Sequence, residues 1–249
     1  MLTGGGEAAD GTVIKTTSAN NLFPDLSAHT RCASPDGWAI ISDIDDTIKV
    51  THTTDPIGTL KTTFADIPET TKGLPEFYQN LDVEFKNPAW FYLSASPYNL
   101  YPFLHQFIHD HYKPGTIILR ENSWMVLGDV LKSLTQGTQA YKTDRMDKIH
   151  HWLPNRKFIC VGDSTQSDPE AYAEMFKRYP GWIHAIYIRV VEGDPHMSEK
   201  NKPERFEKAF DGVPSHIWRL FTNPQEDLGE HVRQVAGEVH IGTTSTLQQ

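Results

Sequence analysis

Five short apolar runs divide the chain, and this pattern constrains its fold more than any other feature. Each run has the length and composition of a buried β-strand: residues 38–41, 90–93, 116–119, 158–161 and 183–190. Three of the predicted strands end in small or acidic polar residues, at Asp43, Ser94 and Asp163. Because ligands of open α/β sheets bind beyond the carboxyl ends of the strands, we expect these three side chains to converge at one edge of a sheet.

Predicted helices alternate with these strands. Apolar periodicity and polar flanks predict helices at residues 74–81, 98–111 and 144–152. Another helix is expected around Pro169, which suits a first turn, with Ser167 or Asp168 as the cap. The alternation predicts the α/β class: a Rossmann-like core with a mainly parallel central sheet and helices on both faces.

Two stretches between the predicted strands, residues 48–91 and 96–141, are the places where a lid domain could be inserted. Neither has room for an independent lid of about 50 residues with its own core, once the predicted helices and strand are subtracted. A small exposed insertion at residues 51–63 could still shape the entrance. We therefore expect no large cap domain and an open site.

Composition excludes several classes of protein. The 249 residues carry 23 Lys and Arg against 32 Asp and Glu, a net charge of −9, which argues against nucleic-acid binding. No apolar run approaches the roughly 18 residues of a transmembrane helix, and the N-terminal stretch lacks the apolar segment of a secretory signal. Only Cys32 and Cys160 occur, which excludes a disulfide framework and favours a reducing, cytoplasmic location.

The chain is expected to divide into three parts. Residues 1–30 are rich in Gly, Ala, Thr, Ser and Asn and are interpreted as a flexible leader. Residues 31–221 contain all the predicted strands and form the folded domain. Residues 222–249 are polar and are interpreted as a C-terminal tail without chemistry of its own.

Asp43 and Asp45, two residues apart at the end of the first predicted strand, are the strongest chemical signal. A carboxylate at a buried strand tip is costly unless a metal or hydrogen-bond donors balance it. An EF-hand calcium loop is excluded because Ile48 stands where that loop needs glycine. The motif alone also fits the Asp-x-Asp of metal-dependent glycosyltransferases, or two side chains that only cap a turn.

Residues 43–47, with the sequence DIDDT, resemble the first signature of the haloacid dehalogenase (HAD) phosphohydrolases. Ser94 matches their second motif, a hydroxyl residue at a strand tip, and Lys142 matches the third, a lysine upstream of the last acidic strand end. Residues 162–168, with the sequence GDSTQSD, match the fourth. Four motifs in the expected order and on the expected strands are much more specific than any one of them.

Longer stretches are similar to the fungal actin-patch type of phosphatidate phosphatase. The matching stretches are residues 38–56, 94–101 and 156–172. The resemblance extends over residues 37–191, so the predicted folded domain is an HAD-like phosphatase domain. Two residues beside the expected site depart from the family: Tyr98 stands where Trp is frequent, and Thr165 where Gly is usual. Neither change removes a catalytic group.

The resemblance implies phosphoryl transfer through a phosphoaspartate. Asp43 would be the nucleophile, and Asp45 would protonate the leaving oxygen and then activate water. Ser94 would donate a hydrogen bond to a phosphoryl oxygen, and Lys142 would neutralise charge on the nucleophile and the phosphoryl group. Thr47 would steady the loop that holds both aspartates.

The resemblance also implies a magnesium ion, which prefers oxygen ligands in octahedral geometry. Asp43, the backbone carbonyl of Asp45 and Asp163 would bind it. Asp168 would lie in the outer coordination shell of the ion.

Some of these side chains also have plainer interpretations. Asp168 could be only a helix cap, Thr47 could only satisfy a turn, and Asp46 is expected to point to solvent or cap the turn. His105 and His109 lie four residues apart on a predicted helix, a spacing that could hold zinc. No third ligand follows them, so we interpret them as a partly exposed helix face.

Two of the motif assignments have competitors. Lys148 is the alternative to Lys142, which we prefer because its distance from the fourth motif suits the family and because it precedes the predicted helix. Ser96 is the alternative to Ser94, which we prefer because it directly follows the strand.

The expected function is magnesium-dependent hydrolysis of a phosphate monoester, with phosphatidate converted to diacylglycerol and phosphate. The alternative substrate is another organic phosphate, such as a prenyl phosphate or a biosynthetic intermediate. A different class is an Asp-x-Asp glycosyltransferase, and a third is a non-catalytic binding module. An open site suits a head group presented at a membrane surface, so we expect a phosphorylated lipid as partner and peripheral contact with membranes.

Overall fold

The computed structural model of the chain describes residues 11–17, 27–51, 68–121, 137–193 and 197–244. The predicted insertion at residues 51–63 lies outside these ranges except for its first residue.

A six-stranded parallel sheet forms the centre of the molecule, in the order β5-β4-β3-β6-β7-β8. The strands are β3 (Trp38–Asp43), β4 (Ala89–Pro97), β5 (Thr116–Arg120), β6 (Lys157–Asp163), β7 (Ile183–Arg189) and β8 (Trp218–Phe221). Five of them were predicted from their apolar runs. The order places β3 between β4 and β6, so the three strands that carry the polar motif residues are direct neighbours. The predicted α/β class is confirmed.

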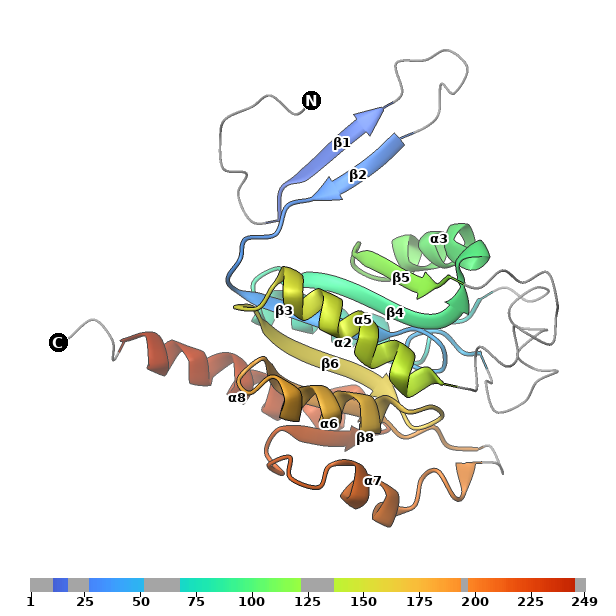
Figure 1. The fold of residues 1–249 in the computed structure, drawn as a ribbon, viewed down its shortest axis with the longest axis vertical. Helices are drawn as coiled ribbons and strands as arrows, with labels where there is room; N and C mark the ends of the chain where they lie inside the picture. Colours follow the sequence, from blue (N-terminus) through green and yellow to red (C-terminus); the bar gives the residue numbers. More distant parts are fainter. Residues whose placement is uncertain (1–10, 18–26, 52–67, 122–136, 194–196, 245–249) are drawn as a thin grey trace.

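Helices cover both faces of the sheet (Figure 1). They are α2 (Leu74–Glu84), η1 (Tyr98–Leu100), α3 (Tyr101–His111), α5 (Thr138–Trp152), α6 (Asp168–Arg178), α7 (Pro203–Ala209) and α8 (Pro224–Thr244). Side chains alternate along each strand, so Ile40 belongs to one core with α2, α3 and α8, whereas Ile41 belongs to the other with α5, α6 and α7. No large cap covers the sheet edge among the residues that the structure describes.

The region expected as a flexible leader contains an antiparallel hairpin in its described part. Its strands are β1 (Val13–Thr17) and β2 (Ser27–Arg31), and the hairpin projects away from the central sheet (Figure 1). One link to the domain is the hydrogen bond from Arg31 Nη1 to Asn87 Oδ1, at 3.2 Å.

The region expected as a polar tail contains α8. Leu228 and Val232 of this helix are fully buried in the core shared with α2 and α3. His231 adds a hydrogen bond with the Tyr187 hydroxyl, 3.1 Å from its Nδ1, and Gln225 donates to the carbonyl of Gly73 at 2.7 Å. Through these contacts α8 covers one face of the sheet. It is therefore part of the folded domain. None of the helices in the described ranges is long and apolar enough to cross a membrane.

Candidate active site

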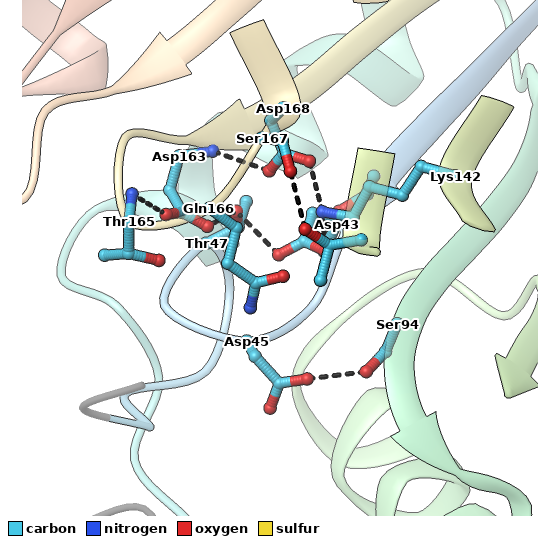
Figure 2. A network of polar contacts seen from close by, with 12 residues as sticks. Asp43, Asp45, Thr47, Ser94, Lys142, Asp163, Thr165, Gln166, Ser167 and Asp168 are labelled. Carbon is cyan, nitrogen blue, oxygen red and sulfur yellow. Dashed lines mark hydrogen bonds and ion pairs between the residues drawn. The ribbon is translucent and has the colours of Figure 1, made fainter. Parts of the chain in front are cut away.

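The candidate site lies at the carboxyl ends of three neighbouring strands, where the predicted polar residues meet (Figure 2). Asp43 is the last residue of β3 and pairs with Leu93 of β4, so Ser94 follows at the same level of the sheet. Asp163 ends β6 on the other side of β3. The expected convergence at one sheet edge is therefore present.

Lys142 joins two of the carboxylates. Its Nζ donates to Asp43 Oδ1 at 2.6 Å and to Asp168 Oδ1, and all three side chains are buried. Lys142 lies inside α5, which begins six residues earlier than predicted, so the expectation that this lysine precedes the helix is wrong. The competing Lys148 is half-exposed and pairs with Asp144 at 3.1 Å. The structure thus places Lys142, and not Lys148, in the site.

Asp163 and Asp168 are tied to each other through the backbone. The Asp163 N–H donates to Asp168 Oδ2 at 3.0 Å, so this carboxylate binds Lys142 with one oxygen and the β6 terminus with the other. Ser167, and not Asp168, occupies the cap position of α6. Gly162 allows the close approach, because a Cβ there would lie 2.5 Å from Asp168 Oδ2.

Thr47 lies between the first and fourth motifs. Its Oγ1 is 3.0 Å from Asp163 Oδ2 and 3.2 Å from Asp43 Oδ2, so one hydroxyl group bridges two carboxylates. The Thr165 N–H donates to the other oxygen of Asp163 at 2.5 Å. Thr47 therefore links strand ends as well as holding its own loop.

Asp45 has different surroundings, made mainly of hydroxyl groups. Its Oδ2 accepts hydrogen bonds from Ser94 Oγ at 2.5 Å and Ser96 Oγ at 3.0 Å. Its Oδ1 accepts one from Thr51 Oγ1 at 3.0 Å, and Lys49 Nζ lies 3.8 Å away. Ser94 and Ser96 therefore both reach the site, although they were expected to be alternatives. The expectation that Ser94 directly follows the strand is wrong, because β4 continues through both serines to Pro97. Lys49 and Thr51 were missed, and their only signal was their nearness to Asp45 in the chain.

Asp46 does not point to solvent. It is buried, its φ is 60°, and its Oδ1 accepts a hydrogen bond from the Thr51 N–H at 2.9 Å. Arg189 Nη1 donates to its carbonyl at 2.6 Å. The alternative expectation, that Asp46 caps the turn, describes this arrangement.

Burial and like charges raise the pKa values of the acidic cluster. Burial is the main reason why the pKa of Asp43 lies well above its usual value; Lys142 opposes this shift, and the neighbouring carboxylates add to it. Burial, then Asp168, raises the pKa of Asp163 to about 7. Burial lowers the pKa of Lys142, but Asp168 and Asp43 outweigh it, so the pKa lies above its usual value. The cluster holds more negative charge than one lysine balances.

A divalent cation fits this charge. Asp43, Asp163 and Asp168 each offer a carboxylate oxygen, and these oxygens lie within 4.8 Å of one another. Carboxylate oxygens are hard ligands of the kind that magnesium and calcium prefer. Both oxygens of Asp168 have a donor of their own, Lys142 and the Asp163 N–H, whereas Asp43 Oδ2 and Asp163 Oδ2 share the single hydroxyl of Thr47, so these two oxygens are better placed to bind a cation.

The loop after β6 is held from outside by residues that sequence analysis missed. Arg205 of α7 donates to the carbonyl oxygens of Ser164 at 2.6 Å and Gln166 at 2.5 Å, and it pairs with Glu170 at 3.0 Å. Lys200 Nζ donates to the carbonyl oxygen of Thr165. Both basic residues lie beyond the stretch that carries the family resemblance, so no motif pointed to them.

The remaining candidates lie apart from this chemistry. His105 and His109 of α3 stack with ring centroids 6.4 Å apart, and the metal-competent cluster found among the described residues does not include them. Cys160 is buried within β6, where burial raises the pKa of its thiol, and Cys32 is a free, partly buried thiol.

Comparison with known proteins identifies relatives among fungal proteins. The chain is 36% identical over 210 residues to phosphatidate phosphatase APP1 of Saccharomyces cerevisiae, covering 80% of this chain and 33% of that protein. It is 27% identical over 195 residues to an uncharacterised protein of Schizosaccharomyces pombe, covering 75% of this chain and 31% of that protein. The chain thus spans about a third of the length of these relatives.

A family model covers the part of the chain that builds the site. The model described as "Phosphatidate phosphatase APP1, catalytic domain" matches residues 38–190, which run from the start of β3 to one residue beyond β7. This stretch contains all four motifs, from Asp43 to Asp168. The chain therefore belongs to the family of phosphatidate phosphatase APP1 catalytic domains.

Proposed function

We propose that this chain is a magnesium-dependent phosphatase that hydrolyses a phosphate monoester through a phosphoaspartate, with phosphatidate as the substrate. The observation that carries the proposal is the contrast between two aspartates at one strand end. Asp43 is ion-paired to the buried Lys142 at 2.6 Å, which suits a nucleophile, whereas Asp45 accepts hydrogen bonds from hydroxyl groups with Lys49 3.8 Å away, which suits a proton carrier.

The reaction proceeds in two steps. In the first, a carboxylate oxygen of Asp43 forms a bond to phosphorus, the bond to the alkoxide oxygen breaks, and Asp45 gives that oxygen a proton. In the second, water attacks phosphorus, Asp45 takes a proton from it, and the bond to Asp43 breaks to release phosphate. Lys142 stays charged throughout and offsets charge on Asp43 and the phosphoryl oxygens.

Magnesium completes the site in this proposal. The carboxylates of Asp43 and Asp163 would hold the ion together with the backbone carbonyl of Asp45, while Asp168 orients Lys142 and the end of β6. When bound, the ion offsets negative charge on the transferring phosphoryl group. EDTA should remove activity, magnesium should restore it, and calcium should restore it poorly because calcium takes longer and more numerous ligands. Full activity after exhaustive chelation would contradict the metal requirement.

The substrate is proposed from the relative's name and from the absence of a large cap over the described sheet edge. Phosphate release should be compared for phosphatidate and lysophosphatidate in mixed micelles, prenyl phosphates, sugar phosphates and p-nitrophenyl phosphate. We expect the highest kcat/KM for phosphatidate and weak activity on p-nitrophenyl phosphate. A preference for a soluble sugar phosphate would overturn the choice of substrate. A preference for a prenyl phosphate would support the alternative substrate class.

A lipid substrate also implies where the protein works. We propose a cytoplasmic protein that makes peripheral contact with membranes. The competing glycosyltransferase interpretation is disfavoured by the site, because metal binding by Asp-x-Asp alone would not require the buried Lys142 beside Asp43.

A further inference from the structure

Gln166 carries a buried polar atom that the reaction described above does not use. Its side-chain oxygen Oε1 is buried and has no hydrogen-bond partner among the residues that the structure describes. The side chain leaves the loop after β6 and points toward the space between Asp43 and Asp45 (Figure 2). A buried acceptor without a donor costs about 1–3 kcal/mol, so its presence in a reaction centre calls for a partner that arrives with the reaction.

The position of Gln166 is fixed by its backbone. Arg205 Nη2 donates to its carbonyl oxygen at 2.5 Å, and the same guanidinium holds the carbonyl of Ser164. Thr165 lies between Ser164 and Gln166. Lys200 Nζ donates to its carbonyl oxygen, and the Thr165 N–H donates to Asp163. The amide is thus presented from a braced loop, as a group that must orient a reactant requires.

The chemistry of an amide oxygen limits what it can bind. It accepts hydrogen bonds and cannot donate them, so it cannot hold a phosphoryl oxygen, which has no hydrogen to give. A water molecule that attacks phosphorus has two hydrogens. One passes to the Asp45 carboxylate, and the other needs an acceptor nearby.

We propose that Gln166 Oε1 accepts a hydrogen bond from the water that hydrolyses the phosphoaspartate, and so orients that water toward phosphorus. The inference rests on the proposed function, because it needs the phosphoaspartate on Asp43. Water forms the new O–P bond, one proton goes to Asp45, and the O–P bond to Asp43 breaks, leaving the Asp43 carboxylate and inorganic phosphate. Gln166 keeps its hydrogen bond to the second hydrogen of the water.

This role separates the two steps. Formation of the phosphoaspartate consumes no water, so loss of the amide should leave the first step nearly unchanged and slow only the second. The phosphoenzyme should then accumulate.

The test is Gln166→Met, which keeps a similar length and removes the acceptor. Its matched control is Gln139→Met, because Gln139 is also half-buried and its amide nitrogen donates to Glu174 Oε2 at 2.9 Å. With phosphatidate labelled in its phosphate and presented in mixed micelles, rapid acid quenching measures the covalent phosphoenzyme in a single turnover. We expect Gln166→Met to form it at a rate within threefold of the wild-type rate and to hydrolyse it roughly 10- to 100-fold more slowly.

Thermal unfolding and magnesium titration supply readouts besides the rate. Removing a buried acceptor that has no partner should leave Tm unchanged or raise it, and the magnesium concentration for half-maximal activity should not change. A lower Tm with equal slowing of both steps would show a structural role and overturn the inference. A raised magnesium requirement would show that Gln166 acts on the metal site, and it would also overturn the inference.

Failure of the proposed function has a different signature. If wild-type protein forms no phosphoenzyme and Asp43→Asn remains active, the phosphoaspartate itself is wrong, and this inference falls with it. If wild-type protein forms a phosphoenzyme that Gln166→Met hydrolyses at the wild-type rate, only the role of Gln166 is wrong.

Discussion

Asp43 and Asp45 are separated by one residue, but they lie in different electrostatic environments. Asp43 shares its surroundings with two further buried aspartates and one lysine, Lys142. Asp45 has the hydroxyl groups of Ser94 and Ser96 on one carboxylate oxygen, and Thr51 on the other. Lys142 pairs directly with one carboxylate, whereas hydroxyl groups donate to the other and Lys49 Nζ lies 3.8 Å from it.

The difference suits the two roles that the reaction needs. A nucleophile must be ionised when the substrate arrives, and Lys142 at 2.6 Å favours the ionised form of Asp43 against the burial and the neighbouring carboxylates that raise its pKa. A general acid and base must gain and lose a proton. Hydroxyl groups can rotate, so they can hydrogen-bond to the ionised and to the protonated form of the Asp45 carboxyl. One short turn after β3 therefore supplies both kinds of carboxylate.

The largest test of this comparison is to neutralise each aspartate in turn. Asp43→Asn should lower phosphatidate hydrolysis by more than about 1,000-fold, because an amide is a poor nucleophile. Asp45→Asn should lower it by about 100- to 10,000-fold, because the alkoxide leaves without a proton.

The choice of substrate separates these two variants. The p-nitrophenolate ion leaves without a proton, so with p-nitrophenyl phosphate Asp45→Asn should still form the phosphoenzyme, while Asp43→Asn should not. Acid-quenched labelling measures both. The comparison fails if Asp43→Asn keeps activity within tenfold of wild type, or if the two variants behave alike on this substrate.

The next largest effect is expected from Lys142, the lysine that pairs with Asp43 and Asp168 in the acidic cluster. Lys142→Met leaves Asp43 and Asp168 buried without their cation, so it should lower the free energy of unfolding by about 3–5 kcal/mol in metal-free protein. Chemical denaturation in EDTA measures this. Lys148→Met is the control and should change stability by less than about 0.5 kcal/mol, because its pair with Asp144 is exposed.

A double variant sharpens the interpretation. Adding Asp168→Asn to Lys142→Met removes one of the stranded charges and should recover part of the lost stability. If the double variant loses more free energy of unfolding than the two single variants lose together, the charge imbalance inferred for this cluster is contradicted.

A third prediction concerns pH in metal-free protein. Asp163 has a pKa of about 7 when folded, against 3.8 as its ordinary value. Below pH 3.8 the Asp163 carboxyl is mostly protonated in the folded and in the unfolded state, so it does not oppose folding. As pH rises toward 7, the unfolded chain loses the proton first, so the free energy of unfolding should fall, by at most roughly 1.4 kcal/mol per pH unit.

The comparison protein for this pH series is Asp163→Asn, which has no such proton to lose. In EDTA, wild type should lose stability relative to Asp163→Asn between about pH 4 and pH 7. Saturating magnesium should remove the difference or reverse its sign, because the ion binds the ionised carboxylate. Parallel pH profiles of the two metal-free proteins would refute the raised pKa.

Much of this arrangement could be predicted from the sequence, because strand ends in a parallel sheet meet at one edge. The apolar runs before Asp43, Ser94 and Asp163 were long enough to predict strands, and the order of motifs placed them together. The start of α5 was misplaced because Thr138 and its neighbours are polar. The helix begins after Gly137, which adopts a φ of 65° that favours glycine.

Contacts between distant parts of the chain could not be predicted in this way. Arg205 reaches the carbonyl of Gln166 across 39 positions, and nothing local to either residue signals the contact. The helix α8 did have a signal, because Leu228, Val232 and Val235 recur at helical spacing, but the polar composition around them hid it. Whether these residues pack on the sheet depends on the face that the rest of the fold leaves uncovered.

The smallest predicted effects distinguish the two serines that bind Asp45. Ser94 Oγ is 2.5 Å from Asp45 Oδ2 and also accepts the Ser96 N–H at 2.9 Å, whereas Ser96 Oγ lies 3.0 Å from the same carboxylate oxygen. We expect Ser94→Ala to lower kcat by about tenfold and Ser96→Ala by about threefold, since each removes one hydrogen bond to a charged group. In an Asp45→Asn background, Ser96→Ala should have almost no further effect, because this serine acts through the carboxylate. Ser94→Ala should still raise KM there, because its hydroxyl is also expected to donate to a phosphoryl oxygen. Equal effects of the two serines in both backgrounds would mean that they only fill space beside Asp45, and the hydroxyl environment would then not distinguish it from Asp43.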